Sequence, residues 1–229
     1  PVIAPYACVC DLTLGSETAK QTLNAAIKGG PEPVVHYAAL PSARFKDLID
    51  CLDETRDPAR LRLVLEKPLG RNGEESALIE QYLSSKLDES QIYRIDHYLG
   101  KQAVQNLLAL RLGNRIFEPL LTREHVAHIQ ITVAEDLGVE DRAGFYENAG
   151  AIRDMIQSHI LQMLAIVVME PPVSMQADAL RDEKLKVLRS LKVPSVLGTQ
   201  EVVVGKYDKG FEKGHPVPAY KNEKGVSPE

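Results

Sequence analysis

The stretch LRLVLEKPLG, residues 61–70, is the segment that decides the fold class. Leucine stands at every second position of its first five residues, with a valine among them, which is typical of a buried β-strand. Lys67-Pro68 and Gly70 follow directly, and this combination favours a turn. The segment therefore predicts a strand over residues 61–66 and a turn over residues 67–70.

Strands and helices alternate on both sides of this segment. Two further short apolar runs are predicted to be strands, at residues 34–40 and 91–95. Helical spacing covers residues 17–27, 43–52 and 74–87. Because parallel strands need a crossover connection that is usually a helix, this alternation predicts parallel βαβ units.

The pattern changes after Asp96. Helices are predicted over residues 102–112, 150–169 and 177–191. A half-buried strand is predicted at residues 129–133, a β-like segment at residues 202–207, and loop over residues 213–229.

Composition excludes several classes of protein. The 229 residues are 44% hydrophobic and 26% charged, as in an ordinary water-soluble protein. A net charge of -5 argues against a nucleic-acid backbone as the main partner but leaves room for a local basic pocket for a small anion. The 3 cysteines match no zinc or redox spacing, which fits free thiols in a reducing cytosol.

Neither a membrane span nor a signal peptide is predicted. The longest apolar stretch, residues 160–169, is well short of the roughly 20 residues that a span needs, and the N-terminus has no basic region before an apolar one. We therefore expect a cytoplasmic location. The chain opens on Pro1 without an initiating methionine and stops at Glu229 without a terminating element, so we expect it to be part of a longer protein.

His159 is the first candidate for chemistry. It lies in the middle of an apolar stripe of the helix predicted over residues 150–169. One interpretation is a core histidine whose ring nitrogen is satisfied by a carbonyl; the other is a desolvated general base. Asp154, one and a half turns earlier, would place a carboxylate at the mouth of the same cavity.

The second candidate is the octapeptide RIDHYLGK, residues 94–101, which runs from a strand into a helix. Lys101 would fall at the start of that helix, where backbone amides and the positive end of the dipole favour an anion, and His97 would reinforce this. A phosphate-bearing substrate fits such a site, and a solvated turn is the alternative. Asp96 is a plausible carboxylate partner for an imidazole elsewhere.

Two further residues, Lys67 and Glu135, are weaker candidates for a role in the site. Lys67 follows a predicted parallel strand at the edge where ligands bind in α/β sheets, although a simple turn explains it equally. Glu135 closes the strand predicted at residues 129–133, or is a solvated acid. The sequence contains no G-x-G-x-x-G motif and no P-loop. His125 and His128 lack further ligands nearby, so no metal site is predicted.

Taken together, these segments resemble the glucose-6-phosphate dehydrogenase family. The resemblance is strong from about residue 61 to residue 191 and rests on seven motifs: VLEKPLG (64–70), YRIDHYLGK (93–101), VQNL (104–107), RIFEPL (115–120), AEDLG (134–138), RDMIQSH (153–159) and MEPP (169–172). The fold implied is α/β plus α+β. It comprises the latter part of a Rossmann-like parallel-sheet domain over residues 1–95 and part of a β+α domain with an antiparallel sheet over residues 96–229.

The resemblance implies oxidation of the C1 hydroxyl of glucose 6-phosphate to 6-phosphogluconolactone, the first step of the pentose phosphate pathway. The hydride acceptor would be NADP, with NAD as the alternative, and the partners would be glucose 6-phosphate and further copies in a homodimer or homotetramer. The roles implied for single residues are a general base (His159), its carboxylate partner (Asp96), the phosphate grip (His97, Tyr98, Lys101), acids bonding sugar hydroxyls (Glu135, Asp154) and a lysine between nicotinamide and sugar (Lys67).

Departures from the family pattern keep two rival hypotheses open. The glycine-rich nucleotide fingerprint, Gly-x-x-Gly-Asp-Leu, is absent, as is the region that would complete the large sheet. One rival is a non-catalytic sugar-phosphate-binding fragment or interaction module of the same ancestry. The other is a related dehydrogenase of different hexose phosphates or of unphosphorylated glucose.

Overall fold

The computed structural model describes residues 16–27, 33–52, 61–135, 137–192 and 202–227. The chain divides into two compact units, residues 1–96 and residues 97–229. The glycine stop signal near residue 30 and two of the cysteines, Cys8 and Cys10, lie outside the described residues.

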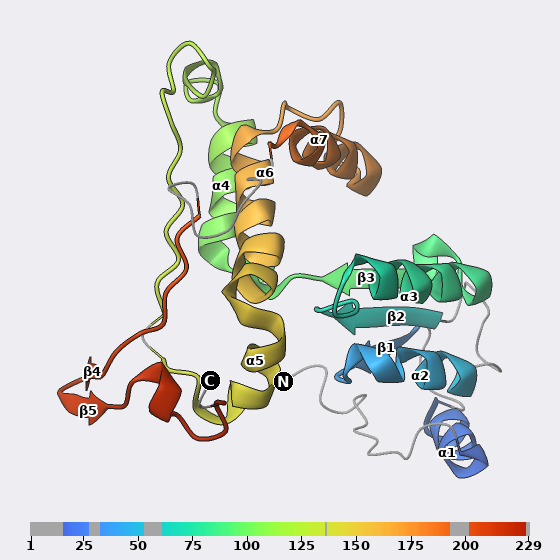
Figure 1. Cartoon of the computed structure of the whole chain (residues 1–229). Helices are drawn as coiled ribbons and strands as arrows, with labels where there is room; N and C mark the ends of the chain where they lie inside the picture. The colour runs from blue at the N-terminus through green and yellow to red at the C-terminus, as the bar shows by residue number, and fades with distance from the viewer. Residues whose placement is uncertain (1–15, 28–32, 53–60, 136, 193–201, 228–229) are drawn as a thin grey trace. The chain divides into compact units, whose positions relative to one another are not determined.

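The first unit contains a three-stranded parallel sheet with the strand order β1-β2-β3 (Figure 1). The helix α1 (Glu17–Ile27) precedes the sheet, whose strands are β1 (Val34–Ala38), β2 (Leu61–Glu66) and β3 (Ile92–Ile95). The connections contain the short helix η2 (Ser42–Arg44), followed by α2 (Phe45–Cys51) and, after β2, α3 (Gly73–Lys86). The predicted parallel βαβ units are therefore confirmed.

Alternation along β2 builds the core of this unit. Leu61, Leu63 and Leu65 are each at most 1% exposed, and they cluster with apolar residues of α2 and α3. The opposite face carries exposed side chains in the described part of the unit, among them Val35 and Tyr37 of β1. The parallel sheet thus packs its helices against one apolar face.

The turn after β2 is set by Gly70 and Asn72. Gly70 has a φ of +88°, and a Cβ atom there would lie 2.8 Å from the Ser76 amide nitrogen, so glycine is required. The Asn72 side chain then accepts a hydrogen bond of 2.9 Å from the Glu75 amide and caps α3. Lys67 is half-buried within this turn, and its bond to Pro68 is cis.

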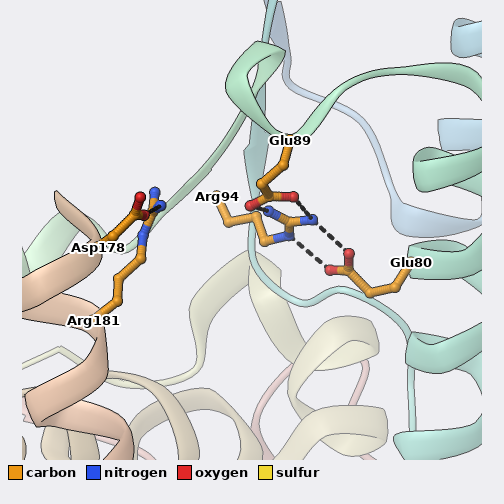
Figure 2. Close-up of polar contacts among 5 residues, drawn as sticks. All are labelled: Glu80, Glu89, Arg94, Asp178 and Arg181. Carbon is orange, nitrogen blue, oxygen red and sulfur yellow. Dashed lines mark hydrogen bonds and ion pairs between the residues drawn. The ribbon is translucent and has the colours of Figure 1, made fainter.

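An arginine fork ties β3 to the helices before it. Arg94 donates to both carboxylate oxygens of Glu80 in α3, at 2.7 and 2.5 Å. It also donates to Glu89 of the short helix η4 (Glu89–Gln91), at 2.8 and 3.2 Å (Figure 2). These hydrogen bonds and charges raise the pKa of Arg94 above its ordinary value.

The second unit is mainly helical. It begins with the short helix η5 (His97–Gly100) and α4 (Gln102–Gly113), and α4 lies along α6 (Leu161–Val168), which in turn packs on α7 (Ala177–Ser190) (Figure 1). Ala165, Met169 and Val187 form the buried core of this bundle.

The helix predicted over residues 150–169 is not a single α-helix, which corrects that prediction. Gly150 (φ 65°, ψ 170°) breaks the run at the end of α5 (Ala143–Ala151). Next comes the π-helix η8 (Ile152–Ile160), which leads into α6. The wider spacing of a π-helix turns Ile152 and Ile156 outward, 38% and 42% exposed, although the apolar stripe predicted them buried.

The strand predictions for the second unit are wrong. Residues 129–133 and 202–207 form no strand in the structure, because no described strand pairs with them. The strands lie instead in β4 (Gly210–Glu212) and β5 (His215–Val217), an antiparallel hairpin. Lys213 and Gly214, with φ angles of 49° and 85°, form its two-residue turn, so β4 directly precedes the predicted loop and β5 lies within it.

One helical run reaches the dimensions of a membrane span. Among the described residues, Glu140–Val168 is long and apolar enough, by length and composition, to cross a membrane. A helix in the core of a water-soluble protein meets the same test. Its two buried ionisable side chains, Asp154 and His159, are unusual for a segment in lipid.

Candidate active site

The π-helix η8 positions the two ionisable side chains of the site. Asp154 is 7% exposed and His159 is 1% exposed, while most of their neighbours in η8 are more exposed. They are five residues apart, which is the hydrogen-bond spacing of a π-helix, and the amide of Leu161 donates to the carbonyl of Ile156 with that same spacing. The local π geometry therefore buries a carboxylate and an imidazole on one helix.

Three rings meet at His159. The Tyr98 ring stacks on the His159 imidazole, with 4.0 Å between ring centroids and 16° between planes. The His97 ring meets His159 edge-on at 4.5 Å and 72°, and it also meets Tyr98 edge-on. The stack restrains the orientation of the imidazole, because offset and edge-to-face contacts of this kind are favourable.

Tyr98 links the rings to two charged groups. Its hydroxyl donates to Oε1 of Glu135 at 2.9 Å, and Nζ of Lys101 lies 3.5 Å from the centre of its ring. Tyr98 is buried, whereas Glu135 and Lys101 are exposed. An imidazole, a carboxylate and an ammonium group thus surround one tyrosine.

Lys101 stands at the start of a helix, as predicted. It is the N-cap residue of α4, and its carbonyl accepts from the amides of Val104 and Gln105. The positive end of the α4 dipole and the Lys101 ammonium group therefore lie together. His97 begins the short helix η5, which leads to Lys101, so its ring and the start of α4 lie in one region of the second unit.

Arg142 is a residue of the site that the sequence did not indicate. It closes the short helix η7 (Glu140–Arg142), and its Nη2 donates to Oδ2 of Asp154 at 3.0 Å. The arginine is 61% exposed, while the carboxylate that it pairs with is almost fully buried. A charged triplet at residues 140–142 was the only signal, and such triplets are common on surfaces.

The structure brings most of the predicted site residues together in the second unit. His97, Tyr98 and His159 are in mutual ring contact, and Tyr98 joins Glu135 and Lys101 to them. Asp154 lies on the same helix as His159. Asp96 is the last residue of the first unit, and Lys67 lies in that unit after β2, so their part in the site stays a prediction.

The chemistry available in the second unit is acid–base and anion-binding chemistry. A buried imidazole with a fixed ring can take a proton from a hydroxyl group. The exposed Lys101 and the edge of His97 can attract a phosphate group beside it.

Comparison with known proteins assigns both units. Residues 10–106 match the family model described as "Glucose-6-phosphate dehydrogenase, NAD binding domain". Residues 108–229 match the model described as "Glucose-6-phosphate dehydrogenase, C-terminal domain". The chain therefore matches both domain models of one class of proteins, whose N-terminal domain is described as NAD-binding.

Within that class, the chain belongs to the glucose-6-phosphate dehydrogenase family. A glucose-6-phosphate 1-dehydrogenase of Rhizobium meliloti is 47% identical over 189 residues, which cover 82% of this chain and 38% of that protein. The corresponding protein of Dickeya dadantii is 40% identical over 222 residues, covering 95% and 45%. Plant relatives, such as one of Spinacia oleracea, are chloroplastic.

A solved structure shares the fold. It is a glucose-6-phosphate dehydrogenase in complex with its substrate glucose-6-phosphate, with a TM-score of 0.76 and 32% identity, and the match covers 92% of this chain and 43% of that one. The predicted family and fold class are confirmed. The chain spans less than half the length of the relatives that it matches.

Proposed function

We propose that this chain carries the catalytic base and much of the substrate pocket of a glucose-6-phosphate dehydrogenase. The reaction is oxidation of C1 of glucose 6-phosphate to 6-phosphogluconolactone, the entry to the pentose phosphate pathway. The observation that supports it best is the contact of His97 and Tyr98 with the buried His159, next to the start of α4. Residues 1–95 serve as the partial dinucleotide-binding domain and residues 96–229 as the partial substrate domain.

His159 is proposed to accept the proton of the C1 hydroxyl. As the hydride leaves C1, the C1 hydroxyl becomes acidic, and a neutral imidazole beside it accepts the proton. Asp96, next to His97 in the chain, is proposed to hold the imidazole in the required tautomer and to stabilise its charged form. Removal of the base slows the reaction without removing the contacts that bind the sugar.

The residues around Tyr98 are proposed to bind the phosphate and the sugar of the substrate. Lys101, His97 and Tyr98 hold the phosphate at the positive end of α4. Glu135 and Asp154 accept hydrogen bonds from sugar hydroxyls. These assignments place the charged end of the substrate over the exposed Lys101 and the reacting carbon near the buried imidazole.

The residues present fit a nicotinamide coenzyme in part. Lys67 follows β2 at the carboxyl end of a parallel sheet, the edge where dinucleotides bind, and it is proposed to lie between the nicotinamide and the sugar. The glycine-rich phosphate fingerprint is absent from the sequence. The coenzyme, NADP with NAD as the alternative, supplies the acceptor for the hydride. We also propose a cytoplasmic homodimer or homotetramer with no nucleic-acid or membrane partner.

Turnover tests the proposal. Glucose 6-phosphate and NADP or NAD are mixed with the chain, and reduction is followed at the nicotinamide absorbance band. His159→Asn is expected to lower the rate by a factor on the order of 10²–10⁴, with glucose 6-phosphate affinity within about twofold of the wild type. His128→Asn, an exposed histidine of the same unit, is the matched control and should change neither.

The two rival functions give different results. Glucose 6-phosphate binding by calorimetry without any turnover in the wild type would instead support a non-catalytic sugar-phosphate-binding fragment. Lys101→Ala is expected to weaken glucose 6-phosphate by about tenfold or more and to leave unphosphorylated glucose unchanged. Equal effects on both sugars would refute the phosphate assignment and favour a dehydrogenase of another hexose.

A further inference from the structure

The ring of Tyr98 contacts two groups that can both carry positive charge. Its centre is 4.0 Å from the centre of the His159 imidazole, and the two planes are nearly parallel. The Nζ atom of Lys101 is 3.5 Å from the same ring centre. The ammonium group and the imidazole are therefore neighbours through a single aromatic ring.

Contact with the Tyr98 ring favours the protonated form of His159. The face of an aromatic ring attracts cations, and an imidazole becomes a cation when it takes up a proton. The hydroxyl of Tyr98 donates to Oε1 of Glu135 at 2.9 Å, and this hydrogen bond to a charged group fixes the ring in its contact with the imidazole. The ring thus makes His159 a stronger base.

The charge of Lys101 acts in the opposite direction. Its ammonium group occupies the same ring and repels a protonated imidazole. The imidazole centre and Nζ each lie at most 4.0 Å from the ring centre. Their separation is therefore shorter than the Debye length of roughly 8 Å at physiological salt, so the repulsion is only partly screened. Without a bound anion, Lys101 weakens the base.

Other charges around the stack are held by the fold. The remaining ionisable residues of η5, α5 and η8, with the residues beside or paired with them, are Asp96, His97, Arg142, Tyr146, Glu147, Arg153 and Asp154. Asp154 pairs with Arg142, and Glu147 accepts a hydrogen bond from Tyr220. The helix α6 carries no ionisable side chain. Lys101, by contrast, is exposed, so a bound anion can offset its charge.

We propose that the charge at Lys101 sets the proton affinity of His159 across the ring of Tyr98, so that a phosphate bound at Lys101 strengthens the base. The phosphate offsets the ammonium charge, and the ring then stabilises the imidazolium that forms as the C1 hydroxyl loses its proton. Tyr98 is a positioning residue in this scheme, because it acts through His159. The inference rests on the proposed function of His159 and Lys101.

NMR titration of the histidine rings tests the coupling without any turnover. The ring signal of His159 in the whole chain is assigned by its loss in His159→Asn, and its titration midpoint is measured with and without saturating glucose 6-phosphate. Binding of the sugar phosphate is expected to raise the midpoint by about half a pH unit or more. The signal of His128, an exposed histidine of the same unit, is the internal control and should not move.

Lys101→Met tests the coupling without any ligand. The variant removes the charge and keeps a side chain of similar length, so the midpoint of His159 should rise by about half a pH unit in the substrate-free chain. Lys209→Met, at an exposed lysine of the same unit, is the matched control. An unchanged midpoint in Lys101→Met overturns the proposal. A midpoint that rises in this variant but not with glucose 6-phosphate refutes the phosphate assignment of the proposed function and supports the coupling.

Two variants of Tyr98 test the part of the ring. Tyr98→Leu is expected to lower the midpoint of His159 by about half a pH unit, because the imidazolium loses the ring face. Tyr98→Phe keeps the ring and should stay close to the wild type, which separates the loss of the ring from the loss of the hydroxyl. A wild-type midpoint in Tyr98→Leu, or an equal drop in both variants, overturns the role given to the ring.

Discussion

The carboxylate of Asp154 is buried and forms an ion pair with Arg142. Its side chain is 7% exposed, and the guanidinium of Arg142 reaches it from twelve residues away in the chain. A buried carboxylate stays charged only where hydrogen bonds and an opposite charge offset the loss of solvation. Arg142 is therefore a positioning residue for Asp154, and through it for the sugar hydroxyl in the proposed reaction.

Replacement of Arg142 tests this pairing. Arg142→Ala removes the ion pair, and we expect the free energy of unfolding to fall by about 1 kcal/mol, since the arginine is largely exposed and screened by solvent. In the active protein we also expect KM for glucose 6-phosphate to rise more than kcat falls. Chemical denaturation and steady-state kinetics measure the two effects.

A matched variant distinguishes the loss of the Arg142–Asp154 ion pair from a general loss of surface charge. Arg181 pairs with Asp178 at 3.0 Å on the exposed surface of α7 (Figure 2). Because exposed pairs contribute little, Arg181→Ala should leave stability and KM unchanged. If both variants behave alike, Arg142 has no special role in holding Asp154.

For single residues, the sequence predicted which side chains are buried better than it predicted which residues they contact. His159 was expected in a buried stripe, and it is buried, because an apolar helix face is a local pattern. Arg142 was missed because its partner is set by a bend at Gly150, between η7 and Asp154, that no short pattern encodes. The roles of Asp96 and Lys67 rest on the family resemblance and remain predictions.

The arginine fork on β3 is the clearest polar link between two elements. Arg94 makes two-pronged contacts with Glu80 and Glu89 (Figure 2), which hold the end of β3 against α3 and η4. Planar, two-pronged pairs of this kind are stronger than ordinary surface pairs. They therefore fix the end of β3 within the first unit.

Arg94→Lys keeps the charge but removes the fork. We expect the free energy of unfolding to fall by about 1 kcal/mol, with the loss reduced at high salt because the group is partly exposed. Thermal denaturation in low and high salt measures this. Arg71→Lys, at a far more exposed pair with Glu75, serves as the control, and an equally large loss there would contradict the special role of the fork.

The C-terminal segment is fixed to α5 by a tyrosine. Tyr220 of the short helix η9 (Tyr220–Asn222) packs with Val139 and Ala143, and its hydroxyl donates to Glu147. The hydrogen bond to this carboxylate, with burial and nearby negative charge, raises the pKa of Tyr220 to about 12. The phenol thus keeps its proton more tightly in the folded protein than in the unfolded chain, where its pKa is about 10.

The sign of the pH effect follows from that shift. The stabilisation by Tyr220 is fully present below about pH 10 and is lost as the pH rises through about 12. We expect Tyr220→Phe to be less stable than the wild type by about 1–2 kcal/mol near neutral pH, with the difference shrinking above about pH 10. Denaturant titrations across this range measure it. A difference independent of pH would show that the lost contact is packing and not the hydrogen bond.

Elements with a simple repeat were predicted well, and those with an unusual backbone were not. The strand at residues 61–66 and the helix at residues 17–27 have the expected limits, because alternation and helical spacing are local. The π-helix was missed because its repeat mimics an α-helix over a few residues. The hairpin was missed because Lys213 adopts a positive φ that glycine or asparagine would have signalled.

Two segments of the second unit, around residue 129 and around residues 203–204, carry solvent-exposed apolar side chains. Val203 and Val204 are 87% and 66% exposed and Ile129 is 43% exposed, and no described strand pairs with either segment. Extended chain with exposed β-branched residues is a template for pairing with another chain. We therefore expect this chain to self-associate when concentrated.

Charge on one of these segments should reduce the association. Val203→Lys with Val204→Lys is expected to shift the average mass in size-exclusion chromatography with light scattering toward the monomer. Val173→Lys is the control, since that residue is 97% exposed in a loop after α6. If the double variant associates as the wild type does, the interface between copies lies elsewhere.

The π-helix determines how the Asp154–His159 pair could be grafted onto another protein. Asp154 and His159 are buried together only because the backbone between them is wound one residue wider than usual. Copied onto a regular designed helix, the pair at a spacing of five would diverge, and a graft would have to move the carboxylate one residue closer, to a spacing of four. Conversely, deletion of the single residue Gln157 from the native chain should turn the segment into a regular α-helix that still presents the acid and the base on one face, at a spacing of four.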